Sequence, residues 1–354
     1  MLPLKGWSGF SVTPFFFIWQ RYDGGMEYAI AFFCAATLTG AIVPYLIRFL
    51  HARQVMDIPN ARSNHTLPTP RGGGLAVIPA IVIVSGCFAL WQHSVNHDLL
   101  ILLTAVTTLA LISFLDDLYN LSAVLRLIIQ IVVISACTFL LFPTISITNG
   151  YLPPILEKLI LIGTWLWFVN LYNFMDGIDG ITGSETLLLG LGSAVILMNH
   201  QQLGIPLIVA FPVAGAALGF LVWNWHPAKI FLGDVGSIPL GFLVGWLMLS
   251  LADHGYWTAA MLLPAYYLAD SSLTLLRRLL AGKPIWKPHS EHFYQQAIRK
   301  GLSHHRVTLT VATTGLGLWL LGFASTYWPQ ESTALLFTAG LLVCYVLFRF
   351  RSLK

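Results

Sequence analysis

The chain has 354 residues, of which 56% are hydrophobic and only 10% are charged, and its mean hydropathy is +0.74. A soluble domain carries about 25% charged residues, so this composition excludes a water-soluble fold and predicts a protein embedded in a lipid bilayer. The net charge of +4 is small and scattered, and no nucleic-acid partner is expected. Four cysteines, Cys34, Cys87, Cys137 and Cys344, lie within apolar stretches, so we interpret them as small core residues.

The first 25 residues hold only a short apolar patch, and we interpret residues 1–25 as an N-terminal extension or a misassigned start. Residues 26–354 are predicted to form a single transmembrane domain. A spanning helix needs roughly 20 mostly apolar residues. This criterion predicts an all-α polytopic bundle of ten or eleven helices, with candidate spans at residues 27–49, 73–91, 99–115, 122–142, 155–172, 183–199, 205–224, 236–252, 256–275, 307–324 and 333–349.

Basic residues are distributed unequally between the two sides of this bundle. When the loops are assigned alternately to the two sides, one side receives only Lys5, Arg21 and Lys158, and the other receives the remaining sixteen lysines and arginines. Because short basic loops stay in the cytoplasm, we predict that the basic face and the C-terminus are cytoplasmic. The two long polar loops, residues 50–72 and 276–306, lie on this same face.

Five aspartates also fall at helix ends on the predicted cytoplasmic face. Asp116 and Asp117 end the third span in FLDD, Asp176 and Asp179 follow the fifth in DGIDG, and Asp234 precedes the eighth in FLGDVGS. Carboxylates are costly in a membrane protein unless they meet a cation. Oxygen ligands and a phosphate-bearing substrate suit Mg²⁺. The five aspartates therefore predict a Mg²⁺-dependent phosphate chemistry, with Mn²⁺ as a substitute ion.

Each acidic motif also has a simpler structural interpretation. The FLDD pair can be a solvated helix cap, DGIDG a tight turn, and Asp234 the N-cap of its helix. Against these, Asp176 and Asp179 would share one face if their segment were helical. Asp234 stands between glycines at a helix start, where free N–H groups favour anions. The combination of all three motifs on one face favours the functional interpretation.

Two further polar segments face the same side. In HSEHFYQQ, one turn of helix would place the His289 and His292 imidazoles side by side, where they could bind phosphate oxygens. We interpret His304 and His305 more readily as polar surface. Arg71 precedes three glycines in PTPRGGG, which is typical of an anion-binding turn or of a flexible hinge.

Taken together, FLDD, NLYNFMDGIDG, WNWHPAKIFLGDVGS and the final His loop resemble, in order, the motifs of the polyprenyl-phosphate N-acetylhexosamine-1-phosphate transferases of glycosyltransferase family 4. The similarity runs from about residue 27 to residue 306. It implies a reaction in which undecaprenyl phosphate attacks the β-phosphorus of a UDP-N-acetylamino sugar. UMP leaves, and a lipid-linked sugar remains in the bacterial inner (cytoplasmic) membrane. The resemblance also allows a homodimer.

The resemblance implies roles for individual residues. Asp234 would be the principal Mg²⁺ ligand, with Asp117 beside it. The catalytic group would be Asp116, Asp117, Asp176 and His292. Residues that bind the lipid phosphate, nucleotide or diphosphate would be Arg71, Asn170, Asn173, Asp179, Asn224, Phe231 and His289.

The His loop departs from part of this family and narrows the expected biology. It contains only two histidines, with Ser290 and Glu291 between them, whereas the peptidoglycan and common-antigen enzymes carry more. The chain is therefore more similar to initiators of O-antigen in lipopolysaccharide biosynthesis that use a 6-deoxy amino sugar such as N-acetylfucosamine or N-acetylquinovosamine. The alternatives are a cation-coupled membrane transporter and another membrane phosphotransferase or phosphatase.

Overall fold

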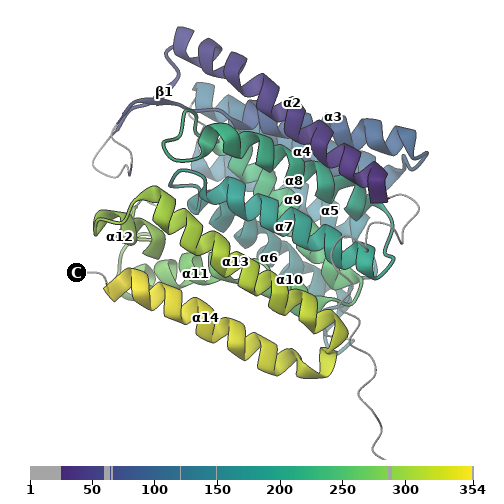
Figure 1. Cartoon of the computed structure of the whole chain (residues 1–354). Coiled ribbons are helices and arrows are strands. Elements are labelled where there is room, and N and C mark those ends of the chain that lie inside the picture. Colours follow the sequence, from purple (N-terminus) through teal and green to yellow (C-terminus); the bar gives the residue numbers. More distant parts are fainter. Residues whose placement is uncertain are drawn as a thin grey trace, which may run out of the picture.

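The computed structural model describes residues 25–59, 64, 67–119, 121–148, 150–285 and 289–352. The segment interpreted as an N-terminal extension, residues 1–25, therefore lies outside the described residues except for Gly25. The described part is a bundle of helices with one two-stranded sheet (Figure 1). This confirms the predicted all-α fold.

Ten helices in the described ranges are long and apolar enough to cross a membrane. They are α2 (Gly25–Ala52), α3 (Gly74–Trp91), α4 (His97–Tyr119), α5 (Ala123–Leu141), α6 (Pro154–Phe174), α7 (Ile181–Asn199), α8 (Ile205–Asn224), α9 (Asp234–Asp253), α13 (His304–Tyr327) and α14 (Ser332–Ser352), the last preceded by a 3₁₀ turn, η1 (Pro329–Glu331). Shorter elements are α10 (Trp257–Leu262), α11 (Ala265–Leu280), α12 (Phe293–Arg299), β1 (Met56–Asp57) and β2 (Thr69–Pro70).

Several helix starts follow from local sequence chemistry. The Ser122 hydroxyl accepts the Leu125 N–H at 3.2 Å at the start of α5, and the Ser303 hydroxyl accepts the Arg306 N–H at 3.4 Å at the start of α13. Pro154 begins α6, where its missing N–H costs nothing because the first helical N–H groups have no intrahelical partner. These caps explain why the predicted boundaries hold to within a few residues.

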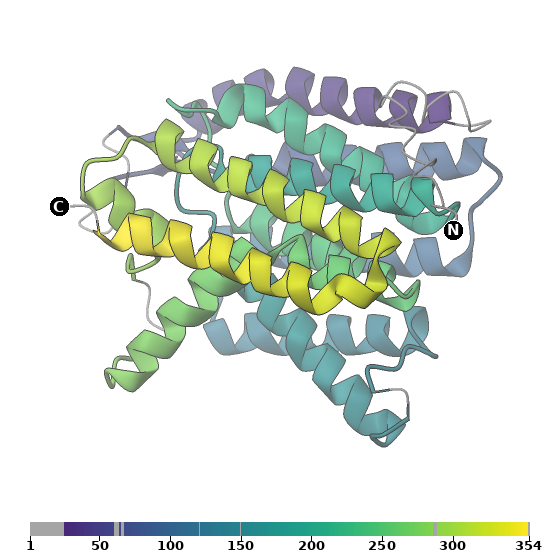
Figure 2. The same cartoon turned by 60° about the horizontal axis from the view of Figure 1, so that its bottom comes forward.

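The predicted span at residues 256–275 is wrong as a single helix. It is divided into α10 and α11, with Pro264 in the gap between them. Proline lacks the N–H that a continuous helix needs and clashes with the preceding turn. Figure 2 shows the green α11 leaning away from the neighbouring helices.

Helix α9 forms the centre of the bundle. The residues of its most apolar 18-residue stretch are all buried, whereas only 22% of the residues are buried in the corresponding stretches of α2 and α5. Large apolar side chains such as Phe33 and Leu111 cover the outer face, as a lipid-facing surface requires. The interpretation of the cysteines as core residues is correct only for Cys137, because Cys34, Cys87 and Cys344 are exposed on this outer surface.

One end of the bundle gathers the polar loops, and we call it the site end. The sheet, α12 and the C-terminal end of α14 all lie there (Figure 1). Met56 pairs with Pro70 and Asp57 with Thr69 in antiparallel register. The first or last turns of α3, α4, α6, α7, α8, α9 and α13 meet at this end, which brings motifs from distant parts of the sequence together.

Candidate active site

A cluster of charged side chains lies where α4, α5 and α9 meet the segment after β2. Arg71 Nη2 lies 2.5 Å from Asp234 Oδ1 and 3.9 Å from Asp117 Oδ1. Arg126 Nη1 lies 2.6 Å from Asp116 Oδ2 and 3.4 Å from Asp234 Oδ2. Burial alone would lower the pKa of Arg71, but Asp234 and then Asp117 raise it further than burial lowers it. Two guanidiniums therefore join three carboxylates.

Backbone contacts place Arg71 beside Asp234. Phe231 N–H donates to Pro70 O at 2.8 Å, and the N–H groups of Gly72 and Gly73 both donate to Phe231 O. A Cβ on Gly74 would lie 2.3 Å from Gly236 N, so only glycine allows α3 and α9 to approach this closely. The three glycines therefore hold the segment after β2 tightly against the segment that leads into α9. These contacts do not support a flexible hinge, and the anion-binding turn stays a prediction.

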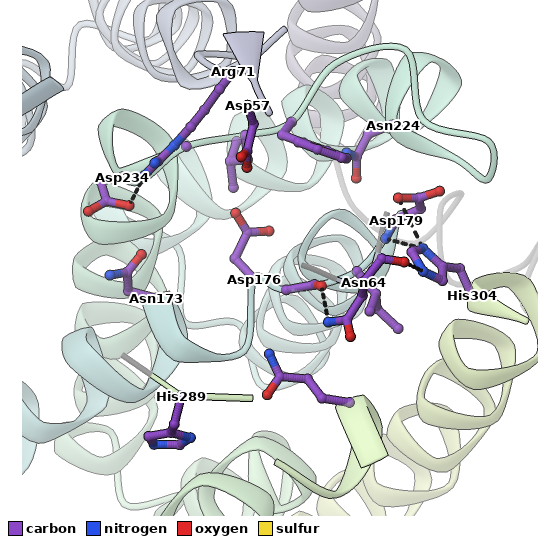
Figure 3. A pocket seen from close by; sticks show the side chains of 16 residues that line it. Asp57, Asn64, Arg71, Asn173, Asp176, Asp179, Asn224, Asp234, His289 and His304 are labelled. Atoms are coloured by element: carbon purple, nitrogen blue, oxygen red, sulfur yellow. Dashed lines mark hydrogen bonds and ion pairs between the residues drawn. The ribbon is translucent and has the colours of Figure 1, made fainter. Parts of the chain in front are cut away.

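Asp234 occupies the first position of α9, as predicted. It is not the N-cap, however, because that position belongs to Gly233, whose φ of 75° suits glycine. The Asp234 side chain instead points to Arg71 (Figure 3) and also contacts Arg126.

The DGIDG segment forms an irregular turn between α6 and α7, so the helical arrangement considered for Asp176 and Asp179 is wrong. Asp176 lies on the floor of a cavity and points to its centre (Figure 3). The surrounding protein keeps water from this carboxyl and raises its pKa to about 6, and the charge of Asp234 adds to the shift. Because of this turn, the side chains of Asp176 and Asp179 lie in different parts of the site.

Asp179 is held by two histidines. Its Oδ2 lies 2.6 Å from His226 Nδ1 and accepts the Ala228 N–H at 3.1 Å, and its Oδ1 lies 3.1 Å from His304 Nδ1. Burial alone would raise the pKa of Asp179, but hydrogen bonds from both histidines lower it overall. The interpretation of His304 as polar surface is wrong, because it is buried and its Nε2 lies 2.8 Å from Asn64 O.

These three side chains also form a potential metal site. The ligand atoms of Asp179, His226 and His304 lie within 4.8 Å of one another. Two imidazoles and one carboxylate would suit a transition metal more than Mg²⁺. The separations of 2.6 and 3.1 Å are those of hydrogen bonds, so shared protons account for this arrangement.

The predicted asparagines serve different purposes. Asn224 accepts the Gly180 N–H at 2.9 Å and donates to Ile230 O at 2.8 Å, which ties the DGIDG turn to the α8–α9 loop. Asn173 accepts the Ser237 hydroxyl at 2.5 Å and lines the cavity. Asn170 lies elsewhere, where it donates to Gln130 Oε1 at 2.9 Å and to Leu166 O. The structure brings Asn173 and Asn224 to the site but not Asn170.

The two histidines of the His loop lie close together without the predicted helix. Their ring centroids are 5.0 Å apart, but α12 begins only at Phe293. His289 lines the cavity, and burial, followed by the nearby His292 and Arg278, lowers its pKa to about 4. It is therefore neutral at pH 7. His292 is 2% exposed and is not among the cavity-lining residues.

The cavity between these groups has a volume of about 390 Å³, within the range of small-molecule sites. Of the predicted residues, it contains Arg71, Asn173, Asp176, Asp179, Asn224, Phe231, Asp234 and His289. Asp116 and Asp117 lie beside the cavity, where Asp117 pairs with Arg71 and Asp116 pairs with Arg126. Polar groups thus surround a space that opens at the site end.

Sequence reasoning missed several residues here. Asp57, Asn64 and Gln295 line the cavity, and Arg126 joins Asp116 to Asp234. Only Arg126 gave a signal, because a charged residue in the first turn of an apolar span is rare. The others stand in the polar segments between the predicted spans, where sequence alone gives no reason to select them.

The fold and this site define a polytopic membrane protein with a charged cavity at the helix ends. The sequence profile of glycosyl transferase family 4 matches residues 99–252, which include the FLDD, DGIDG and GDVGS motifs. The chain is 29% identical over 303 residues to the probable undecaprenyl-phosphate N-acetylglucosaminyl 1-phosphate transferase of Bacillus subtilis (strain 168), with 81% of each chain covered.

Other relatives show a comparable sequence similarity. The decaprenyl-phosphate N-acetylglucosaminephosphotransferase of Mycolicibacterium smegmatis is 28% identical, with 87% of this chain and 86% of the relative covered. The phospho-N-acetylmuramoyl-pentapeptide-transferase of Bacillus licheniformis is 27% identical, with 84% and 96% covered. The chain is thus similar, over most of its length, to polyprenyl-phosphate hexosamine-1-phosphate transferases, and its central part matches the profile of glycosyl transferase family 4.

Proposed function

We propose that the protein transfers an N-acetylamino-sugar 1-phosphate from a UDP-sugar to undecaprenyl phosphate and releases UMP. The names of its relatives support a polyprenyl-phosphate sugar-1-phosphate transferase, since each transfers a phosphosugar. The observation that carries the proposal is the charged cluster of Arg71, Arg126, Asp116, Asp117 and Asp234 at the edge of a polar cavity.

The chemistry needs little proton transfer. A lipid phosphate is already largely ionised at neutral pH, because its second pKa is about 6. One of its oxygens forms a bond to the β-phosphorus of the donor, and the bond from that phosphorus to the bridging oxygen breaks, so that UMP carries away the electron pair. Arg71 and Arg126 lie where they can attract both phosphate groups. Their role is to orient the reactants and offset charge.

The carboxylates fit the proposed magnesium ion. Asp234 and Asp117 supply hard oxygen donors beside the cavity, which is the donor type that Mg²⁺ prefers. Bound there, Mg²⁺ would supply charge neutralisation for the diphosphate. Asp234 pairs with Arg71 and Arg126 in this structure, so these arginines orient its carboxylate.

The opposite side of the cavity suits the nucleotide. Phe231 offers an aromatic ring among the residues that line the cavity, and Asn64 offers an amide group on the side away from Asp234 (Figure 3). Asp179 and Asn224 lie on the same side, held in place by their own hydrogen bonds. We place the uracil here and the diphosphate between Asp176, His289 and Asp234.

The donor sugar and the pathway are finer parts of the proposal. The HSEHF loop supports an O-antigen initiator that uses a 6-deoxy N-acetylamino sugar, although the relatives named above act on N-acetylglucosamine or N-acetylmuramoyl-pentapeptide substrates. The asymmetry of basic residues supports a bacterial inner-membrane location with the site end and the C-terminus in the cytoplasm. A homodimer is compatible with this arrangement.

A donor panel tests the reaction. Purified protein in lipid, with Mg²⁺ and undecaprenyl phosphate, is given UDP-N-acetyl sugars that include 6-deoxy sugars. UMP release matched by lipid-linked sugar, and lost with EDTA or Asp234→Asn, is expected. Asp253→Asn, at the other end of α9, is the matched control and should retain activity. Release of inorganic phosphate without lipid-linked sugar would favour a phosphatase instead.

A further inference from the structure

Asp270 is a buried acid that the reaction described above does not use. It lies in α11, with a relative exposure of 0%, on the part of the chain that sequence analysis placed in the ninth span. A carboxylate enclosed in a membrane protein is costly unless several donors surround it. The identity of those donors therefore indicates what Asp270 does.

Two of the donors are backbone N–H groups at the start of α12. Phe293 N–H donates to Asp270 Oδ1 at 3.0 Å, and Tyr294 N–H donates to Oδ2 at 3.1 Å. The first N–H groups of a helix have no intrahelical partner. Asp270 therefore supplies, from another helix, the acceptors that let α12 begin at this point.

A third donor is the side chain of His292. Its Nδ1 lies 3.3 Å from Asp270 Oδ1, and the Tyr266 hydroxyl donates to Oδ2 at 3.1 Å. The carboxylate holds the imidazole at this distance from α11. Asp270 thus fixes the orientation of the His292 ring.

The start of α12, which Asp270 contacts, lies next to the cavity. The Tyr294 hydroxyl donates to Phe174 O at 3.0 Å, just before DGIDG, and Gln295 of α12 lines the cavity. A Cβ on Gly177 would lie 2.1 Å from the Tyr294 hydroxyl oxygen, so the two segments are in direct contact. The His289 ring stacks on His292. Movement of α12 would therefore displace His289 and Gln295.

We propose that Asp270 is the positioning residue of the His loop. From α11 it orients His292 and holds the start of α12, so that His289 and Gln295 face the diphosphate of the donor. This inference rests on the proposed function for its kinetic consequence. Its structural consequence, the anchoring of α12, does not depend on any activity.

Asp270→Asn tests both consequences. The amide replaces one acceptor by a donor, so one N–H of α12 loses its partner. We expect amide hydrogen exchange to accelerate at residues 293–299 while α8 and α9 stay protected. We also expect kcat to fall about 10- to 100-fold, as for other residues that orient an active-site group, while the KM for the UDP-sugar changes less than about twofold.

A double-mutant cycle with His292→Gln shows whether the effect passes through His292. Both single variants should lower kcat, and the double variant should lose little more than the worse single one. His292→Gln alone should leave exchange in α12 unchanged, because Asp270 keeps its backbone partners. Should Asp270→Asn fail to fold, His292→Gln still tests the orientation of the loop. Asp98→Asn, an exposed aspartate at the start of α4, is the control for charge removal.

The outcomes separate the two proposals. Wild-type exchange rates in α12 of folded Asp270→Asn, or an unchanged kcat in His292→Gln, would overturn the role of Asp270. Accelerated exchange in Asp270→Asn, together with a wild-type protein that transfers no sugar, would leave the anchoring of α12 intact and contradict the proposed function instead.

Discussion

Asp176 is a cavity side chain whose protonation state depends on its surroundings in the fold. The enclosed floor of the cavity raises its pKa to about 6. Below that pH the carboxyl becomes neutral, so it no longer attracts a cation or accepts hydrogen bonds as an ion. We therefore expect kcat/KM to fall as the pH is lowered through about 6.

The pH profile of Asp176→Asn checks this assignment. Its residual activity should be lower at pH 8 and should lose the acidic limb, because the amide does not titrate. More Mg²⁺ should move the wild-type limb to lower pH, since a bound cation favours the ionised carboxylate. An unchanged acidic limb in Asp176→Asn would assign the titration to another group.

Arg126 carries a second prediction at the level of single residues. Its guanidinium joins Asp116 to Asp234, so Arg126→Gln leaves both carboxylates without that partner. We expect about a 10- to 100-fold loss of kcat/KM, the usual effect of removing a group that orients charged ligands. Arg306→Gln, an exposed arginine in the first turn of α13, is the matched control. Equal activities of the two variants would contradict the role of Arg126.

Individual residues also show where sequence reasoning ends. Asp234 and Asp176 line the same cavity, because motifs at helix ends on one face of the bundle lie close together. The burial of His304 was missed, since its partners Asp179 and Asn64 are 125 and 240 residues away in the sequence. Asn170 shares a motif with Asn173 but faces Gln130. Motif membership alone does not determine the direction of a side chain.

At the level of elements, the site depends on the close contact between the starts of α3 and α9. Gly74→Ala would place a Cβ 2.3 Å from Gly236 N, and backbone cannot move aside as a flexible side chain can. We expect this variant to lose most transferase activity and to unfold at lower temperature than wild type. The loss should exceed that of Gly163→Ala in α6, where a Cβ would meet no atom within 4 Å.

The Gly163→Ala control also isolates helix propensity. Alanine is favoured over glycine in a helix by about 1 kcal/mol, so this variant should be as stable as wild type or more stable. Thermal unfolding in detergent measures both changes. If the Gly74 and Gly163 variants were equally stable and active, close packing of α3 against α9 would not be what positions Arg71 and Asp234.

For the whole molecule, hydropathy predicted ten of the spans well because the bilayer imposes a minimum length on each helix. It failed at Pro264, where the ninth apolar stretch divides into α10 and α11. Apolar composition sets which residues avoid water but not the direction of the chain. The tilt of α11 and the docking of α12 against DGIDG depend on contacts between distant residues, such as Asp270 with Phe293.

Orientation in the membrane is a further prediction for the whole molecule. A fluorescent protein fused after Lys354 should be bright in bacteria, and alkaline phosphatase fused at the same position should be inactive, because we place the C-terminus in the cytoplasm. An active phosphatase fusion would reverse the orientation and place the cavity on the side without nucleotide sugars.

The fate of the β-phosphorus tests the central claim most directly. The purified protein is given undecaprenyl phosphate and a UDP-N-acetylamino sugar radiolabelled at that phosphorus. Transfer of the sugar 1-phosphate predicts that the label moves into the lipid fraction in step with UMP release. Label that remains in the water-soluble nucleotide, as UDP, while the sugar enters the lipid, would contradict the account, because the enzyme would then transfer the sugar alone.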